Sequence, residues 1–346
     1  MPFYFELILI SGGGRPCMPD ITYEVIDDNA TRPELEDFIA SSANGTLFHS
    51  PRFLNYHGEE KFRSQGGTVH HLLFRQKGRI CAFIPGMIFE TDKGPVYRSP
   101  YGGSYGSFVY DSLTFSETQE ILELFLGFAR EKGISEIHLV PPPPLYCRDS
   151  FSDCFQFLFL SKGFRIGKAE LLMVCRLEPG KDYPLSAMKK KAKEAWRQAL
   201  RKGVTAGPSE DYAAFYEMLL RDKQKFGTST TRTYEELQRI IGLFPGKIRL
   251  WLAWLEGRPI AGGLFFLCNE RAANFLDLCH DVSYYDFRGS NLMLKVALEE
   301  LAALGLRWMD FGPSSFGYEP HHTLIKFKES FGGQGVARLY YELKLD

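Results

Sequence analysis

The same order of elements occurs twice along this chain, and this repetition limits the folds that the chain can adopt. In each half, two apolar segments flank a tight-turn pair, Lys77-Gly78 in the first and Glu256-Gly257 in the second. Later in each half, an amphipathic segment ends at Gly133 or Gly305 and an apolar strand follows at once. Glycine is the residue that best tolerates the left-handed turn that closes a helix. We therefore predict two copies of one α/β unit.

The length of 346 residues suffices for two domains with well-buried cores. We predict an N-terminal extension over residues 1–19, a first domain over 20–180, a second domain over 181–335, and a C-terminal strand over 336–346 that returns to the first domain. Met18 is an alternative start, with residues 1–17 as an extension.

Composition argues against several classes of protein. The formal net charge is −1, so no global field draws the chain to nucleic acid or to an anionic membrane. The seven cysteines form no CxxC pair, which argues against a disulfide framework or a zinc site and favours a reducing compartment. No apolar run reaches the roughly 20 residues that a membrane helix needs. We expect a cytoplasmic protein without a metal, a DNA partner or stable membrane insertion.

Local signals predict the individual elements. Residues 33–41 read as a helix with Thr31 as its cap, and residues 116–132 as a helix capped by Ser116. Residues 79–89 read as one strand after the Lys77-Gly78 turn. Residues 185–202 form a strongly basic helix, which suits a phosphate-bearing substrate or RNA. A solvated helix face is the simpler explanation, because the whole chain is nearly neutral.

The stretch from Gly305 to Gly333 holds the candidates for chemistry. A strand over 307–311 includes Asp310 and breaks at Gly312-Pro313. Strand ends hold residues rigidly beside an open crevice. On composition alone, an ordinary helix–strand–helix connection with surface lysines explains this stretch more simply.

With the segments before it, this stretch resembles the second half of a FemAB-type protein. That family carries tandem GNAT-like (Gcn5-related acyltransferase) domains and includes the BioF2-like acetyltransferases. The resemblance rests on the hairpin over 251–267, on Asp310-Phe311-Gly312, and on Phe327-Lys328 followed by Phe331-Gly332. It implies an α/β (α+β) fold of two tandem GNAT-like domains, with mixed central sheets flanked by helices.

The first half carries matching motifs of its own. The segments 48–51, Phe-His-Ser-Pro, and 101–103, Tyr-Gly-Gly, stand where first-domain motifs of the family stand. The chain departs from the family at Phe53, where the family often has Trp. We expect His49, Tyr101, Gly102 and Tyr105 to bind substrate, because glycines let the backbone approach a ligand and tyrosines offer a flat face with a polar tip. A flexible surface loop is the alternative.

The resemblance implies an N-acyltransferase of the GNAT superfamily. The enzyme would transfer an acyl or aminoacyl group to an amine on a sugar, a peptide or a cell-wall precursor. The donor would be acyl-CoA or aminoacyl-tRNA, so tRNA is one expected partner. An aminoacyl-tRNA-dependent ligase that extends peptidoglycan is one alternative, and a non-catalytic glycan-binding module is another.

The resemblance and the crevice loop together suggest four catalytic residues. Lys328 would offset negative charge in the transition state, with Lys326 as the neighbouring alternative. Asp310 would orient or deprotonate the amine, and Tyr318 would protonate the leaving group. His322, or its neighbour His321, is the expected general base. The ordinary alternatives are a surface lysine, a buried acid satisfied by a loop N–H, and simple packing.

Arg288, Gly289, Ser290 and Asn291 are the expected donor-binding residues. They open a helix, where free N–H groups and the positive helix end can bind the pyrophosphate of a donor. The segment departs from the GNAT pattern Q/R-x-x-G-x-G/A, since only Arg288 and Gly289 stand in recognisable places. A simple cap by Ser290 is the alternative.

Overall fold

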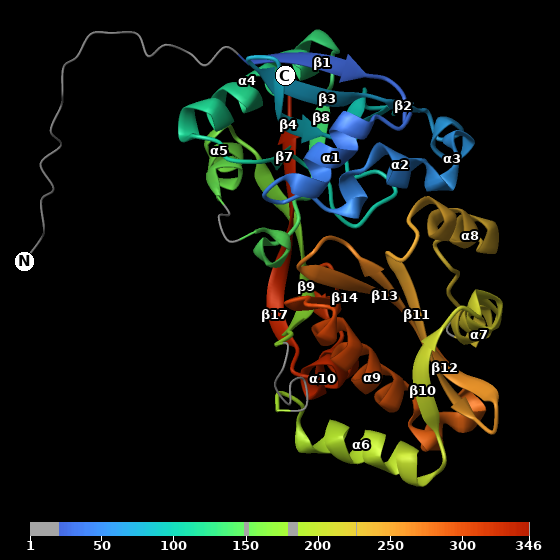
Figure 1. Cartoon of the computed structure of the whole chain (residues 1–346). Coiled ribbons are helices and arrows are strands. Elements are labelled where there is room, and N and C mark those ends of the chain that lie inside the picture. The colour runs from blue at the N-terminus through green and yellow to red at the C-terminus, as the bar shows by residue number, and fades with distance from the viewer. Residues whose placement is uncertain (1–20, 149–151, 179–185, 226, 346) are drawn as a thin grey trace, which may run out of the picture.

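A computed structural model of the chain describes residues 21–148, 152–178, 186–225 and 227–345 (Figure 1). The predicted extension over 1–19, with Met18, and the predicted boundary at 180/181 lie outside these residues. No helix within the described ranges is both long enough and apolar enough to cross a membrane.

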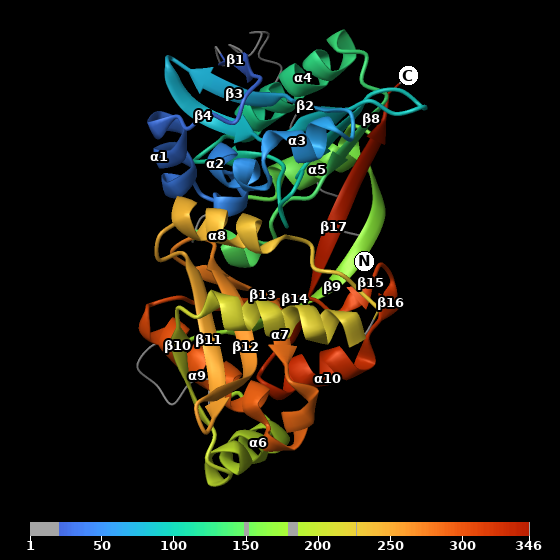
Figure 2. The ribbon, with the colours of Figure 1, turned by 90° about the vertical axis from the view of Figure 1, so that its right-hand side faces the viewer.

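One long mixed sheet runs through both halves of the molecule (Figures 1 and 2). Its 11 strands lie in the order β10 (Thr205–Ser209), β11 (Ile248–Leu255), β12 (Arg258–Leu267), β13 (Ala272–His280), β14 (Trp308–Pro313), β9 (Arg165–Arg176), β17 (Gln334–Lys344), β8 (Glu136–Leu139), β6 (Val96–Ser99), β5 (Met87–Phe89) and β2 (Gly67–Val69).

A second sheet lies in the first half. Its four strands are β1 (Ile21–Ile26), β3 (His71–Gln76), β4 (Arg79–Ile84) and β7 (Val109–Tyr110), in the order β1-β3-β4-β7. The expected single strand over 79–89 is wrong, because β4 ends before Pro85-Gly86 and β5 joins the other sheet. Proline has no N–H for a sheet, and the Gly86 N–H donates instead to His71 Nδ1 at 3.0 Å.

Helices cover both faces of the sheet in the second half (Figures 1 and 2). α7 (Tyr212–Lys225) and α8 (Tyr234–Leu243) pack on one face through Phe215 and Leu237. α6 (Lys190–Arg201), α9 (Gly289–Ala303) and α10 (His322–Ser330) pack on the other face. The first half carries α1 (Pro33–Ser41), α2 (Pro51–Leu54), α3 (Glu59–Arg63), α4 (Phe115–Glu131) and α5 (Cys154–Ser161).

Two of the expected helix caps are wrong. α4 is capped by Thr114 rather than Ser116: Thr114 Oγ1 accepts from the Glu117 N–H at 3.3 Å, and Glu117 accepts from the Thr114 N–H at 2.8 Å. α1 is preceded by Arg32, which makes no side-chain cap bond, so Thr31 does not cap it. Pro33 suits the first helical position without a cap hydroxyl, because its φ is fixed and its missing N–H has no partner there anyway.

The two halves join through paired strands and a shared core. β9 and β17 run antiparallel along both halves, and β17 also pairs with β8 over residues 341–344 (Figure 2). This pairing places β17 beside β8 of the first half, as expected for a C-terminal strand that returns there. The domain boundaries themselves stay predictions. Phe53 of the first half lies 6.1 Å from the rings of both Phe244 and Phe266 of the second. Further apolar clusters lie within each half.

Candidate functional site

The two parallel strands β13 and β14 separate at the centre of the second half. They pair over three positions only, Ala272–Asn274 with Trp308–Asp310. β13 then continues to His280, whereas β14 turns at Gly312, where φ is +72°. Asn274 and Asp310 therefore lie at the point of separation.

Asp310 is fully buried and accepts hydrogen bonds from both halves. Its Oδ2 accepts from Tyr105 Oη at 2.6 Å, from Tyr146 Oη at 2.8 Å and from Asn274 Nδ2 at 3.2 Å. Its Oδ1 accepts from the Gly312 N–H at 2.7 Å. These four hydrogen bonds hold the carboxylate at a fixed position beside the turn. This geometry suits an orienting role for Asp310.

Lys328 lies on the other side of the same turn. Its side chain extends from α10, and the residue is 5% exposed. Nζ donates to the carbonyl oxygens of Gly312 and Pro313, each at 2.9 Å. Burial lowers the pKa of Lys328 to about 8, although the charge of Asp310 opposes this shift. Two carbonyl contacts leave one N–H of the ammonium for a ligand.

A second polar cluster flanks Tyr105. Glu170 on β9 accepts from Arg338 Nε at 3.0 Å and from Tyr340 Oη at 2.8 Å, both on β17. The Arg338 guanidinium lies 5.8 Å from the centre of the Tyr105 ring. Burial would raise the pKa of Glu170, but hydrogen bonds from Lys168, Arg338 and Tyr340 lower it to about 2. The cluster places the Arg338 guanidinium over the Tyr105 ring.

Comparison with known proteins identifies the second half. Residues 186–321 match the acetyltransferase (GNAT) domain family. The second half of this chain is a GNAT domain. A sequence search of the curated proteins finds no match. The family match supports an acyltransferase.

Several solved structures are similar over nearly the whole chain. FemX is 15% identical with a TM-score of 0.69, covering 91% of this chain and 97% of its own. L-PGS from Bacillus licheniformis is 13% identical with a TM-score of 0.55, covering 92% and 93%. A tandem GNAT protein from the clavulanic acid pathway is 11% identical with a TM-score of 0.52, covering 94% and 98%. The shared architecture is the expected FemAB-like tandem GNAT fold.

The expected donor-binding residues of the GNAT domain lie at the start of α9. Arg288 is left-handed, with φ of 59°, and its guanidinium lies 4.8 Å from the Tyr285 ring. No side chain caps this helix, so Ser290 is not its cap. A Cβ on Gly289 would lie 3.0 Å from Ile260 Cδ1, so glycine allows α9 to pack closely on β12. The N–H groups of Gly289 and Ser290 make no hydrogen bond to the described residues.

Two expected catalytic residues, Tyr318 and His322, are not among the hydrogen-bond partners of Lys328. Tyr318 is 70% exposed at the tip of the hairpin formed by β15 (Ser315–Phe316) and β16 (Glu319–Pro320). His322 is exposed in the first turn of α10. Its neighbour His321 accepts the Leu324 N–H at 3.2 Å and so caps that helix. Roles for these residues stay predictions.

The expected substrate-binding residues of the first half shape the loop over 100–108. His49 is fully buried: Nδ1 accepts the Thr46 N–H at 3.1 Å, and Nε2 lies 3.1 Å from the Gly106 carbonyl. Burial lowers the pKa of His49 to about 4, which keeps it neutral. A Cβ on Gly102 would lie 2.9 Å from the side chains of both His57 and Phe62. From this loop, the Tyr105 hydroxyl donates a hydrogen bond to Asp310 in the GNAT domain.

The sequence did not indicate Tyr146, Asn274, Glu170 or Arg338 as site residues. Tyr146 is 164 positions from Asp310, and Arg338 is 168 positions from Glu170. Sequence spacing carries no signal for such pairs. The one available cue was Tyr146, a tyrosine placed two residues after the proline run that ends a strand.

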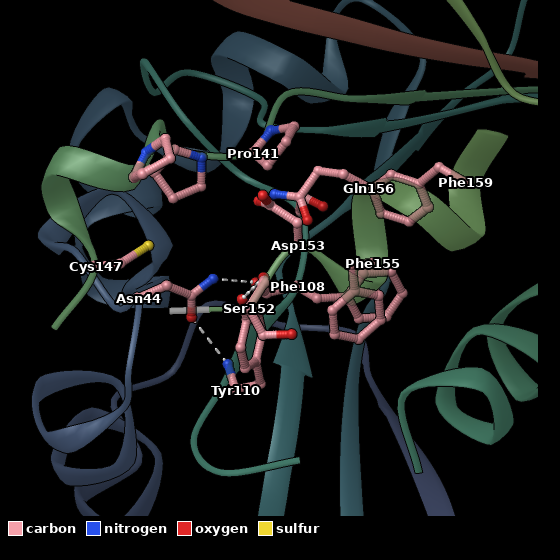
Figure 3. Close-up of a pocket in the computed structure, with 13 residues that line it drawn as sticks. Asn44, Phe108, Tyr110, Pro141, Cys147, Ser152, Asp153, Phe155, Gln156 and Phe159 are labelled. Atoms are coloured by element: carbon pink, nitrogen blue, oxygen red, sulfur yellow. Dashed lines mark hydrogen bonds between the residues drawn. The ribbon is translucent and has the colours of Figure 1, made fainter. Parts of the chain in front are cut away.

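Two pockets lie in the described part of the first half. The smaller one, of about 10 Å³, lies beside Asn44, whose side chain bonds Phe108 and Tyr110 (Figure 3). It has room for no more than a water molecule. The larger one, of about 320 Å³, lies near the end of β1, α2–α3 and β2. Neither is lined by Lys328 or Asp310.

Proposed function

We propose that this chain is an N-acyltransferase that passes an acyl group from acyl-CoA to an amine acceptor beside the end of β14. The observation that carries the proposal is the buried Lys328 ammonium, held 2.9 Å from the Gly312 and Pro313 carbonyls where β13 and β14 separate. In GNAT-like folds, the gap between such strands receives the acyl donor.

The chemistry needs a cation at this point. Attack of the amine on the thioester carbonyl forms the new C–N bond and places negative charge on the carbonyl oxygen. Collapse of this intermediate breaks the C–S bond and moves the charge to the leaving thiolate, which takes up the proton that the attacking amine nitrogen loses. A preorganised cation in a buried site stabilises both charges. Lys328 supplies that cation, while Asp310 and Tyr105 position the turn that holds it.

The start of α9 is the proposed site for the donor's pyrophosphate. The N–H groups of Gly289 and Ser290, which bond to none of the described residues, and the positive end of the helix suit an anion. Arg288 adds a positive charge beside them, and Asn291 lies in the same turn.

A second candidate donor is aminoacyl-tRNA, which would make the chain a peptidoglycan ligase. The observation that favours it is the basic helix α6, which packs against α9 and exposes Lys190, Lys191 and Arg197. Lys202 Nζ donates to the Asp286 carbonyl at 2.9 Å, so this basic segment ends close to the start of α9. FemX and L-PGS share the fold, and the proposed acceptors are an amino sugar, a peptide or a cell-wall precursor.

A cytoplasmic location is part of the proposal. The six cysteines among the described residues are all free thiols. Free thiols suit the reducing conditions of the cytosol.

The test measures acyl transfer from acetyl-CoA and from aminoacyl-tRNA to a panel of amines. Lys328→Met should lower kcat by about 10²-fold with the better donor, as expected for loss of one transition-state contact. Lys326→Met, an exposed neighbour on the same helix, is the matched control and should retain activity. Equal activity of the Lys328→Met variant and the wild type would refute the proposed role.

Donor binding in a salt series separates the two donors. Affinity for tRNA should fall steeply as salt rises, because several phosphates are neutralised, and the triple variant Lys190→Gln/Lys191→Gln/Arg197→Gln should weaken it. Affinity for CoA should be insensitive to this variant.

A further inference from the structure

A cluster of charged side chains on β9 and β17 carries more positive than negative charge. Glu170 Oε2 accepts from Arg338 Nε at 3.0 Å, from Arg338 Nη2, and from Tyr340 Oη at 2.8 Å. Glu170 Oε1 pairs with Lys168 Nζ at 2.5 Å. One carboxylate therefore serves two cations, so one positive charge in this partly buried cluster is left without a counter-charge.

The Arg338 guanidinium keeps one edge for a further partner. Of its five N–H donors, Glu170 takes the one on Nε and one on Nη2. Nη1 bonds to none of the described residues, and it is not among the polar atoms that are both fully enclosed and without a partner. This nitrogen is therefore open to solvent, although the whole side chain is only 12% exposed. The free N–H groups of Nη1 and Nη2 have the spacing that a planar oxyanion accepts.

The Tyr105 side chain connects this cluster to the proposed site. The Arg338 guanidinium lies 5.8 Å from the centre of the Tyr105 ring. The hydroxyl at the far end of the same ring donates to Asp310 at 2.6 Å. A single tyrosine side chain thus reaches from the guanidinium to the carboxylate at the strand separation.

The backbone of β9 makes a second connection. The carbonyl of Leu171, next to Glu170, accepts the Ser314 N–H at 2.7 Å. Ser314 follows Pro313, whose carbonyl accepts from Lys328 Nζ at 2.9 Å. A group bound at the cluster therefore lies close to the turn where we place the acyl transfer.

The charge balance favours a carboxylate over a phosphate. One carboxylate matches the one surplus positive charge of the cluster. A phosphate monoester carries nearly two negative charges at neutral pH, so it would leave negative charge uncompensated beside Glu170, which its hydrogen bonds keep ionised. A neutral amide or hydroxyl would leave the surplus cation unpaired. A carboxylate close to an amine is the chemistry of an amino acid or a peptide.

We propose that Arg338 binds a carboxylate of the acceptor, which is an amino acid or a short peptide. The acceptor amine extends past Tyr105 to the turn at Gly312. Glu170 and Tyr340 are positioning residues, because they hold the guanidinium with its Nη1 edge free. This assignment rests on the proposed function and names the class of acceptor for it.

The test compares acceptors that differ only at the carboxyl group. Glycine is paired with glycinamide, and glycylglycine with its C-terminal amide. KM is measured for transfer from the better donor, and calorimetry gives Kd for each acceptor in the presence of CoA. The ratio between acid and amide in each variant is divided by the ratio in the wild type, so that the different basicities of the amines cancel. The preferred acid shows whether the acceptor is an amino acid or a peptide.

Two variants change the cluster and one serves as a control. Arg338→Gln should lower the preference for acid over amide by about 10–100-fold, as expected for loss of hydrogen bonds to a charged group. Lys168→Gln, at a side chain that is 42% exposed, should fold normally and lower it about two- to fivefold. Arg165→Gln, an exposed residue on the same strand but outside the cluster, is the matched control and should keep the wild-type preference.

Three results would overturn the inference. The first is an equal loss for acid and amide in Arg338→Gln, which is the result expected if the cluster only joins β9 to β17. The second is a wild type that binds neither acid. The third is inhibition by inorganic phosphate that is stronger than inhibition by acetate and is abolished in Arg338→Gln.

The two proposals can fail separately. Carboxylate-dependent binding without any acyl transfer would refute the proposed function alone. Acyl transfer with a preference for acid over amide that Arg338→Gln and Lys168→Gln leave unchanged would refute this subsite alone.

Discussion

Gly312 is the residue on which the geometry of the proposed site depends. Asp310 accepts its N–H at 2.7 Å, and Lys328 donates to its carbonyl at 2.9 Å. Its φ of +72° is a conformation that residues with a Cβ rarely adopt. A carboxylate and an ammonium are thereby held on opposite sides of one turn, each with fixed hydrogen bonds.

The buried Lys328 predicts a pH dependence of activity. With a pKa of about 8, the lysine loses its charge as pH rises through that value, so kcat should fall there. Deprotonation of the acceptor amine acts in the opposite direction, and the profile should be bell-shaped. In Lys328→Arg the falling limb near pH 8 should disappear, because arginine keeps its charge. An unchanged falling limb in that variant would assign it to another group.

The same pKa predicts a dependence of stability on pH. The folded-state pKa is below the ordinary value of 10.5, so between about pH 8 and 10.5 the unfolded chain binds more protons than the folded one. The contribution of Lys328 to the free energy of unfolding should therefore rise with pH across this window. Urea unfolding of wild type and Lys328→Met at several pH values isolates this contribution. A difference between the two proteins that stays constant with pH would contradict it.

Asp310 should contribute strongly to stability. In Asp310→Asn, one end of the side chain becomes an NH₂ group, which cannot accept the bonds now made by Tyr105, Tyr146 and Asn274. We expect a loss of about 3 kcal/mol in the free energy of unfolding, since buried donors lose their partners and Lys328 loses a nearby charge. Tyr146→Phe should cost less, about 1–2 kcal/mol. Urea unfolding measures both, and equal losses would contradict a central role for the carboxylate.

At the scale of elements, local sequence signals placed most helices and strands correctly. β1, α1 and α8 have the predicted bounds, and the Lys77-Gly78 turn joins β3 to β4 as expected. The expected N-caps of α1 and α4 were wrong, and the break between β4 and β5 was missed. In both cases a hydrogen bond to a side chain decided the structure, and a pattern of apolar residues gives no information about such a bond. Glu117 accepts from the Thr114 N–H, and His71 accepts from the Gly86 N–H.

The cap of α4 gives a direct test at this scale. Thr114→Ala removes the hydroxyl that accepts the Glu117 N–H and should cost about 1 kcal/mol of stability. Ser116→Ala, two residues later on an exposed position, should be close to neutral. Urea unfolding of the two variants shows which residue caps α4. A larger loss of stability in Ser116→Ala than in Thr114→Ala would support Ser116, the cap expected from the sequence.

At the scale of the whole molecule, the long sheet and the shared core predict that both halves unfold together. All four tryptophans, Trp196, Trp251, Trp254 and Trp308, lie in the second half, so their fluorescence reports on that half alone. Phe74 is fully buried in the first half, away from the junction core. Phe74→Ala should shift the tryptophan-monitored transition by about 3–5 kcal/mol. A transition at the wild-type urea concentration would show that the halves unfold independently.

The candidate site was predictable in part. Asp310 and Lys328 stand in motifs of contiguous sequence, and Tyr105 stands in a segment rich in glycine and tyrosine. Tyr146, Asn274, Glu170 and Arg338 belong to no such motif. Each acquires its role from a partner on another strand or in the other half.

The sequence by itself determined the order of elements, their duplication and the turn after β14, because apolar periodicity, glycine and proline act within a few residues of the chain. Only the tertiary structure decided that the two halves share one sheet and that Tyr105 and Tyr146 reach Asp310. The physical reason is that strand pairing and burial join positions more than a hundred residues apart, and both the pKa of Lys328 and the satisfaction of each polar group follow from that burial.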